Sequence, residues 1–289
     1  MMKKHQKIKQ HSGTVEFLRR IVKSGGAKVG AAILLFILVF CFIGPFFSPY
    51  GVNDIDVTVS YAGPSSAHWL GTDSLGRDLL TRLMYGGRYS IILGILASLF
   101  SAFFGVVLGS VAGYFGGKTE MFIMRALDVW SALPSMLLCI LISAVLGSGF
   151  FTTILALTIG SIPGGSRMMR GQILSERSKE YIEAAESFNC SKIRIMFRHL
   201  LPNCIQPTIV QTTMSIGSVM IMAASLSYIG LGVQPPIPEW GAMLSEGRAY
   251  IRTYPYLIAA PGIIIGLTVF AINLLGDGLR GALDPKLRD

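Results

Sequence analysis

The sequence has few charged residues, and long parts of it have none. Only 14% of its 289 residues are charged, whereas 52% are hydrophobic. A typical soluble domain carries about 25% charged residues. The shortage of charge argues against a soluble globular protein and predicts a polytopic, all-α membrane protein.

Five stretches contain no Asp, Glu, Lys or Arg: 29–53, 89–117, 129–166, 199–238 and 253–276. A helix needs about 20 apolar residues to cross the hydrocarbon of a bilayer. The third stretch has room for two crossings, because the turn-forming sequence Gly147–Gly149 divides it into two short helices. We therefore predict six crossings, over residues 29–47, 89–113, 123–146, 150–166, 206–230 and 257–276.

The distribution of Lys and Arg predicts the orientation of these crossings. With a cytoplasmic N-terminus, 20 of the 25 basic residues fall in cytoplasmic segments, as the positive-inside rule requires. Both termini are then cytoplasmic. The predicted divisions are a basic cytoplasmic tail (1–28), the first crossing (29–47), an extracytoplasmic loop (48–88), a five-helix core (89–277) with a cytoplasmic loop (167–203), and a second cytoplasmic tail (278–289).

The formal net charge of +9 does not indicate a nucleic-acid partner, because its basic residues are spread over four cytoplasmic segments. The first apolar run, of about 19 residues, is longer than the apolar region of a signal peptide and is expected to remain as a crossing.

Cysteine is scarce, and its positions exclude a disulfide framework. Cys41 and Cys139 fall in predicted crossings, while Cys190 and Cys204 lie in or beside the cytoplasmic loop. The four histidines are isolated, and no Cys/His spacing is typical of a metal site. We expect no metal site and no cofactor in this chain.

One segment approaches a nucleotide-binding motif. GYFGGKT, at Gly113–Thr119, resembles the phosphate-binding loop GxxxxGK[ST]. Three residues instead of four separate its outer glycines, and a predicted membrane helix precedes it in place of a strand. The segment is interpreted as a short inner turn, and the chain is not expected to hydrolyse ATP.

A stripe of small residues lies in the second predicted crossing. It repeats every four residues and comprises Ala97, Ser101, Gly105, Gly109 and Gly113. Small side chains let another helix backbone approach closely inside a membrane. The stripe predicts a helix-packing face.

The segment EYIEAAESFNCSKIRIMFRHLLPN, residues 180–203, is polar and has a helical pattern. Ser178 can cap a first short helix and Ser191 a second. Asn189 tolerates the left-handed conformation that a sharp break between them requires. Pro202 is expected to end the second helix before the fifth crossing.

The first short helix could lie on the lipid surface or dock on another protein. Three glutamates, Glu180, Glu183 and Glu186, disfavour contact with anionic lipid, and adjacent alanines favour close approach to a protein. We therefore predict a protein-docking surface in which four residues share one face of the helix, namely Tyr181, Ala184, Ala185 and Phe188.

The EAA of this segment, followed by FRHLLPN, resembles the signature loop of ABC-importer permeases. HWLGTDSLGRDLLTRLMYGGR (68–88), LSYIGLGVQPPIPEWGAMLSEGR (226–248) and NLLGDGLRGALDPKLR (273–288) are similar to the C-type permease of the peptide and nickel branch. The signature departs from that family at Asn189, where the family has Gly.

The resemblance implies a type I ABC-importer permease fold in a bacterial inner membrane. It also implies a second homologous permease subunit, two ATP-binding subunits that hydrolyse ATP, and an extracytoplasmic substrate-binding protein. The ATP-binding subunits would dock on Tyr181, Glu183, Ala184, Ala185, Phe188 and Asn189, so that closure of the ATPase pair tilts the flanking crossings.

The sequence leaves the cargo and the substrate-binding residues open. Di- or oligopeptides are expected first, and nickel or a metal–chelator complex is the alternative within the same family. An ion-driven carrier is the alternative of another class. It is disfavoured because the sequence has neither acids near mid-membrane nor evident inverted repeats.

Overall fold

A computed structural model describes residues 24–283, so most of the predicted N-terminal tail (1–23) and the last six residues (284–289) lie outside the described residues. Between residues 24 and 283 the regular structure is helical, apart from an isolated β-bridge between Thr72 and Asp78.

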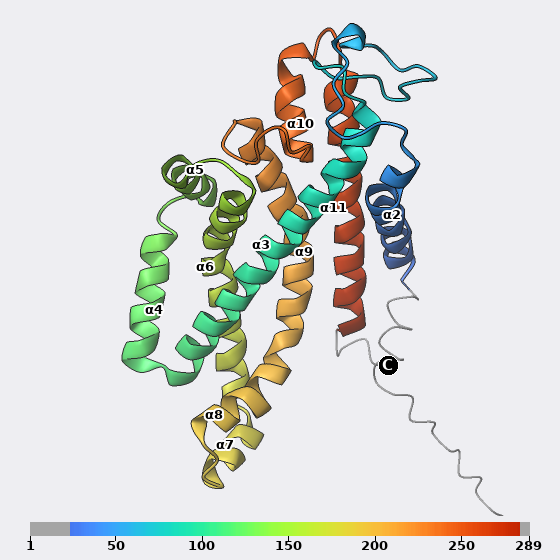
Figure 1. Cartoon of the computed structure of the whole chain (residues 1–289). Coiled ribbons are helices and arrows are strands. Elements are labelled where there is room, and N and C mark those ends of the chain that lie inside the picture. Colours follow the sequence, from blue (N-terminus) through green and yellow to red (C-terminus); the bar gives the residue numbers. More distant parts are fainter. Residues whose placement is uncertain (1–23, 284–289) are drawn as a thin grey trace, which may run out of the picture.

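The longer helices run broadly along one axis, and α3 crosses them obliquely (Figure 1). Short helices lie at the two ends, α7 and α8 at one and α10 at the other; we call these the α7 end and the α10 end. The helices are α2 (Gly25–Phe42), α3 (Leu79–Phe115), α4 (Gly117–Trp130), α5 (Ser135–Leu146), α6 (Phe150–Arg177), α7 (Glu180–Ser187), α8 (Lys192–Arg194), α9 (Leu201–Tyr228), α10 (Trp240–Gly247) and α11 (Tyr256–Leu283). Short 3-10 helices cover Gly44–Phe47, Val57–Val59 and Arg248–Tyr250.

Four helices are long and apolar enough to cross a membrane: α2, α3, α11 and the continuous helix Lys192–Tyr228. The pair α4 and α5 passes the same test only when taken together, and it is bent by 78°. By length and composition, the described residues thus hold four such helices, or five when the bent pair counts as one span. The predicted crossing 150–166 lies in α6, which is 28 residues long but does not meet this test by itself.

The predicted single crossing over 123–146 is wrong in form. Residues 131–134 separate α4 from α5, and Pro134 stands directly before α5. Proline disfavours a helical conformation in the preceding residue, which ends α4 and permits the bend.

The second crossing also begins earlier than predicted. α3 starts at Leu79 instead of residue 89, so the last part of the predicted loop 48–88 is helical. Asp78 caps this helix, because its Oδ2 accepts a 2.8 Å hydrogen bond from the Thr81 amide.

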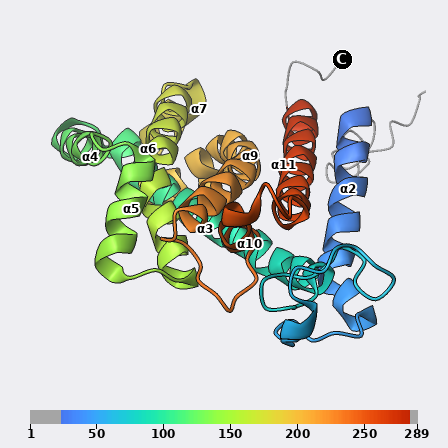
Figure 2. The ribbon, with the colours of Figure 1, turned by 90° about the horizontal axis from the view of Figure 1, so that it is seen from above.

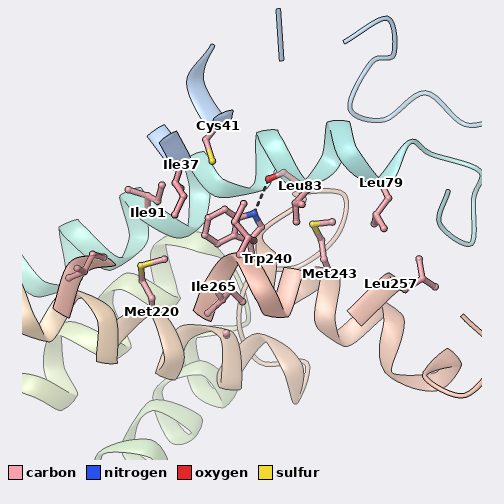
Figure 3. Close-up of a cluster of buried hydrophobic side chains, with 13 residues drawn as sticks. Ile37, Cys41, Leu79, Leu83, Ile91, Met220, Trp240, Met243, Leu257 and Ile265 are labelled. Atoms are coloured by element: carbon pink, nitrogen blue, oxygen red, sulfur yellow. Dashed lines mark hydrogen bonds between the residues drawn. The ribbon is translucent and has the colours of Figure 1, made fainter. Parts of the chain in front are cut away.

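α10 is attached to α3 through the buried side chain of Trp240 (Figure 3). The indole Nε1 donates a 2.8 Å hydrogen bond to the Leu83 carbonyl, and the ring packs in a core that includes Ile37, Ile91 and Met220. A buried Trp needs both apolar contacts and a partner for its N–H, and this position supplies both. The loop between α9 and α11 is thereby held against the start of α3.

Seen from the α10 end, α4, α5 and α6 gather on one side and α11 and α2 on the other, with α9 between them (Figure 2). The backbone of α2 approaches α11 closely at Gly30, where an added Cβ would lie 2.7 Å from the Ala271 carbonyl oxygen. The beginning of α2 and the end of α11 therefore lie together. Figure 1 places both toward the α7 end. The prediction that the two termini are cytoplasmic falls on residues outside the described ones and stays a prediction.

Candidate functional site: the coupling block

Residues 167–203 form the candidate site, which we call the coupling block. It comprises the end of α6, helix α7, helix α8 and a π-helical turn, Ile195–Leu200, that leads into α9. Figure 1 shows α7 and α8 standing out at one end of the molecule. The block therefore presents a polar, helical protrusion directly attached to two long helices.

The buried face of α7 is formed by Ile182 and Ala185. Ile182 is fully buried and Ala185 is 9% exposed. Both pack in a cluster with Ile173 of α6 and with Ile195 and Leu200 of the π turn. This face fixes α7 to its own chain.

The position of Ala185 corrects the predicted docking face. Residues 181, 184 and 188 point outward together, whereas 185 lies one helical step away and points inward. Tyr181 and Ala184 are exposed, and Phe188 is 84% exposed. Glu183 and Asn189 are exposed as well. The outward face available to another protein is thus Tyr181, Ala184 and Phe188, without Ala185.

α7 ends in a sharp reversal at Asn189, whose φ of 56° lies in the left-handed region. The Asn189 amide donates to the Glu186 carbonyl (2.9 Å), and the Cys190 amide donates to the Ala185 carbonyl (3.1 Å). This pair of bonds is a Schellman C-cap, which usually takes Gly at the left-handed position. Asn189 adopts the conformation that the sequence predicted there.

Ser191 then caps the next helix, since its Oγ accepts a hydrogen bond from the Arg194 amide (3.4 Å). The predicted cap at Ser178 is wrong. The Ser178 hydroxyl instead donates to the Ser175 carbonyl (3.1 Å), and Lys179 occupies the position before α7 without a side-chain cap.

The predicted end of the second helix at Pro202 is also wrong, because Lys192–Tyr228 is one continuous helix. Pro202 lies in the first turn of α9, directly after the π turn. A π turn shifts the hydrogen-bond pattern from i−4 to i−5, so the missing amide of Pro202 falls where the pattern already changes. The coupling block is therefore continuous with α9.

A hydrogen-bond chain joins the three helices that meet at the block. The Tyr181 hydroxyl donates to Glu176 Oε1 (2.6 Å), and Asn203 Nδ2 donates both to the Tyr181 hydroxyl (3.1 Å) and to the His199 carbonyl (2.8 Å). Lys179 Nζ adds a 2.7 Å bond to Glu176 Oε2. These contacts link α6, α7 and α9.

The same contacts shift the pKa values of Tyr181 and Glu176. Burial and the bond to Glu176 raise the pKa of Tyr181 to about 12. For Glu176, burial opposes ionisation, but the bonds from Lys179 and Tyr181 outweigh it and lower the pKa. At neutral pH the phenol is thus a donor and the carboxylate an acceptor.

The predicted packing stripe of α3 lies along α6. Gly105 faces Gly165, and a Cβ added at Gly113 would lie 2.9 Å from Ile173 Cβ. Ala97, Ser101 and Gly109 are buried along the same line. α6 thus approaches the α3 backbone closely and continues into the coupling block.

The segment GYFGGKT, which resembles a phosphate-binding loop in sequence, is a turn in the structure. Its Gly116 and Gly117 take positive φ and form the turn from α3 to α4.

A second polar cluster, at the α10 end, had no role assigned to it from the sequence. Arg77 Nε donates to Asp73 Oδ2 (2.6 Å), and Arg82 Nη2 donates to Glu246 Oε2 (3.0 Å). Arg82 is 1% exposed. A buried arginine without acidic partners would be costly, so the pairing fixes residue 246 beside α3.

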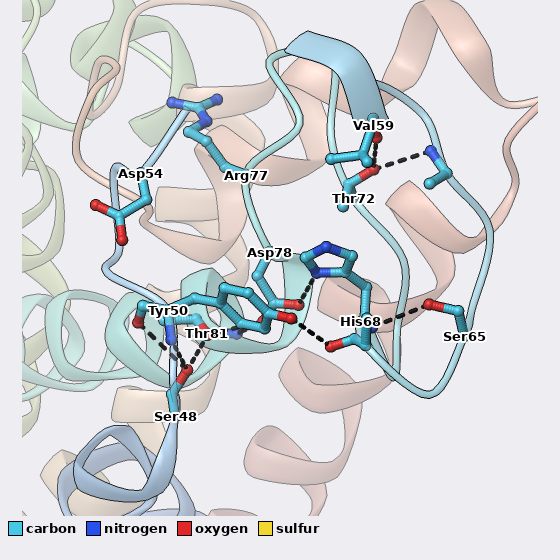
Figure 4. A network of polar contacts seen from close by, with 12 residues as sticks. Ser48, Tyr50, Asp54, Val59, Ser65, His68, Thr72, Arg77, Asp78 and Thr81 are labelled. Carbon is cyan, nitrogen blue, oxygen red and sulfur yellow. Dashed lines mark hydrogen bonds and ion pairs between the residues drawn. The ribbon is translucent and has the colours of Figure 1, made fainter. Parts of the chain in front are cut away.

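His68 and Asp78 extend this second cluster. His68 Nδ1 and Asp78 Oδ1 are 2.9 Å apart, and Asp78 also caps α3 (Figure 4). The sequence did contain the charged segment GTDSLGRD, but its partner Glu246 lies more than 160 residues further along the chain, so the contact could not be predicted.

Comparison with known proteins agrees with this architecture. Residues 105–289 match the family described as "Binding-protein-dependent transport system inner membrane component", and residues 13–64 match the "N-terminal TM domain of oligopeptide transport permease C". In solved inward-facing structures of the MetNI methionine ABC transporter, one chain superposes with a TM-score of 0.59 and 16% identity, over 70% of this chain and 97% of that chain. The likeness to the MetNI chain shows the fold alone.

Several curated relatives are much more similar in sequence. The glutathione transport system permease protein GsiD of Pectobacterium atrosepticum is 44% identical over 94% of this chain and 91% of its own. The dipeptide transport system permease protein DppC of Bacillus subtilis is 41% identical over 96% and 87%. The di/tripeptide transport system permease protein DppC of Pseudomonas aeruginosa is 40% identical over 95% and 92%. The chain is therefore a multi-pass inner-membrane permease of the binding-protein-dependent transport family, in its oligopeptide permease C branch.

Proposed function

We propose that this chain is one of two permease subunits of an ABC importer for small peptides, and that α7 receives the movement of a separate ATP-binding subunit. The exposed face Tyr181, Ala184 and Phe188 carries the proposal. It presents an apolar ring and a small residue on a helix whose opposite face is fixed in its own chain.

The rigid attachment of α7 suits it to transmit force. Its inner face packs on α6 and the π turn, and Tyr181 connects the ends of α6 and α9. A push on α7 would therefore displace two long helices together. Alternating access needs such a bistable arrangement, biased by ATP binding on the partner subunits.

Small peptides are the favoured cargo because the relatives described above are dipeptide, di/tripeptide and glutathione permeases. These names favour peptides over nickel or a metal chelate. Membership in the binding-protein-dependent transport family also disfavours the alternative of an ion-driven carrier. ATP hydrolysis is assigned to separate subunits, and substrate delivery to an extracytoplasmic binding protein.

The test is reconstitution of the chain with its second permease, two ATP-binding subunits and binding protein in vesicles. ATP-dependent uptake of labelled dipeptide is expected, and it should be lost when the binding protein is omitted. A cysteine at Ala184 should form crosslinks to the ATP-binding subunit. Uptake of nickel without peptide uptake would contradict the cargo, and crosslinks only to lipid would contradict the docking role.

A further inference from the structure

A cleft at the α10 end has no part in the proposed coupling. It has a volume of about 610 Å³ and lies between the end of α2, the 3-10 helix Gly44–Phe47 and the first turns of α3. Such a volume falls in the range of ligand sites, roughly 300–1,000 Å³. Its apolar lining includes Phe40, Phe47, Trp69, Leu80 and Met84.

Three polar side chains that line this cleft, Ser48, Tyr50 and Asp78, are already engaged within the chain (Figure 4). The Tyr50 hydroxyl donates to the Ala67 carbonyl (2.9 Å), and Ser48 Oγ lies 2.5 Å from Thr81 Oγ1. Asp78 is held by His68 and Thr81. Because these three groups are satisfied and the rest of the lining is largely apolar, the cleft offers contact area chiefly to an apolar ligand.

The position of the cleft along α2 places it at a membrane boundary. Lys28 marks the opposite boundary, and a crossing needs about 20 residues, which brings the hydrocarbon edge to the region of Phe47. Trp69 and Tyr50 at the rim are the residue types enriched at that depth.

An apolar surface leads from the middle of the bilayer into the cleft. Phe36 is exposed on α2 and stacks on Phe40, with ring centroids 6.3 Å apart. Phe47, which lines the cleft, is 83% exposed at the far end of this surface. Side chains this apolar and this exposed at a bilayer edge are suited to contact with acyl chains.

We propose that the cleft binds a phospholipid of the leaflet at the α10 end. It would hold the segment of one acyl chain that lies nearest the glycerol. The bound lipid would fill the space between α2 and α3 beneath the polar cluster of Asp78 and His68. This role goes beyond peptide transport and is independent of the cargo.

The experiment uses the assembled transporter in nanodiscs that contain phosphatidylethanolamine with a photoreactive diazirine on the acyl chain near its ester. After irradiation, crosslinked peptides are mapped by mass spectrometry. Crosslinks are expected on Leu80 and Met84, which line the cleft, in addition to those on outward residues of α2. Ala67→Trp places a bulky ring at the cleft and should remove the Leu80 and Met84 crosslinks.

Val57→Trp is the matched control, because Val57 is exposed on the same extracytoplasmic segment but does not line the cleft. It should leave the lipid crosslinks unchanged. A second pair is Phe47→Ser, which should reduce them, and Phe46→Ser, which should not. The proposal is overturned if wild-type crosslinks occur only on outward residues of α2, if Ala67→Trp leaves them unchanged, or if Leu80 and Met84 crosslink to another subunit when a residue-specific photoreactive group replaces the lipid probe.

Discussion

The Tyr181 hydroxyl donates a 2.6 Å hydrogen bond to Glu176 Oε1, which joins α7 to the last turn of α6. Asn203 extends this bond to α9. The residue that the sequence placed on a docking face is therefore also the tie between α7 and both flanking helices.

Tyr181→Phe is expected to loosen this tie while keeping the ring. Loss of a hydrogen bond to a charged group costs about 1.5–3 kcal/mol. Peptide uptake per ATP hydrolysed should fall severalfold, with the subunits still assembled. Tyr228→Phe, at the α10 end, is the control. An unchanged ratio of uptake to hydrolysis for Tyr181→Phe would show that the bond does not transmit force.

Replacement of each of the adjacent alanines of α7 by arginine should have a different effect. Ala184→Arg adds a large charged side chain to the exposed face and should weaken assembly with the ATP-binding subunits, while the thermal unfolding midpoint of the isolated chain stays near wild type. Ala185→Arg forces a charge into the cluster around Ile182 and should lower that midpoint, since overpacking alone costs about 1–3 kcal/mol. Equal effects of both changes on assembly and midpoint would contradict the assigned faces.

Asn189→Ala tests the left-handed C-cap of α7. A residue with a Cβ pays about 1–2 kcal/mol in this conformation, which Asn partly offsets by local hydrogen bonding. We expect weaker coupling and faster proteolysis at the Asn189–Cys190 link in the alanine variant. Asn189→Gly should match or exceed wild type, because Gly is the usual residue of this motif. Protection of the alanine variant equal to wild type would argue against the cap.

Gly109→Ala tests the close approach of α3 and α6. An added Cβ would collide with the Ser166 carbonyl oxygen and lie 2.7 Å from Met169 Cβ, so the helices must separate. Thermal stability of the purified chain should fall by several degrees. Gly171→Ala is the matched control, because Gly171 has open space around it, and alanine should be neutral or stabilising in a helix. Similar melting of both variants would contradict the packing assignment.

The predicted orientation is checked with a reporter that is active only outside the cytoplasm. Fusions after Ser60 and Glu246 should be active, and a fusion after Lys179 should be silent. Lys179 directly precedes α7, whereas Glu246 belongs to α10 and Ser60 is followed by Tyr61, whose ring packs on Tyr250 just after α10. Activity after Lys179 would reverse the assignment of the two ends.

The sequence by itself determined the helical membrane class, most of the crossings and the short helices within residues 167–203. Charge-free stretches, basic clusters and helical periodicity are local properties, so they can be read without neighbours. The left-handed Asn189 belongs to the same group, because the tolerance of Asn for that conformation is a property of the residue.

Only the tertiary structure decided which alanine of α7 faces inward, because periodicity shows which residues share a face but not what that face meets. Tertiary contact also decided that Pro202 stays inside a continuous helix, where a π turn accommodates its missing amide. The pairing of Arg82 with Glu246 joins segments 164 residues apart. Its physical cause is the burial of an arginine beside α10, and that burial exists only once α3, α10 and α11 have packed together.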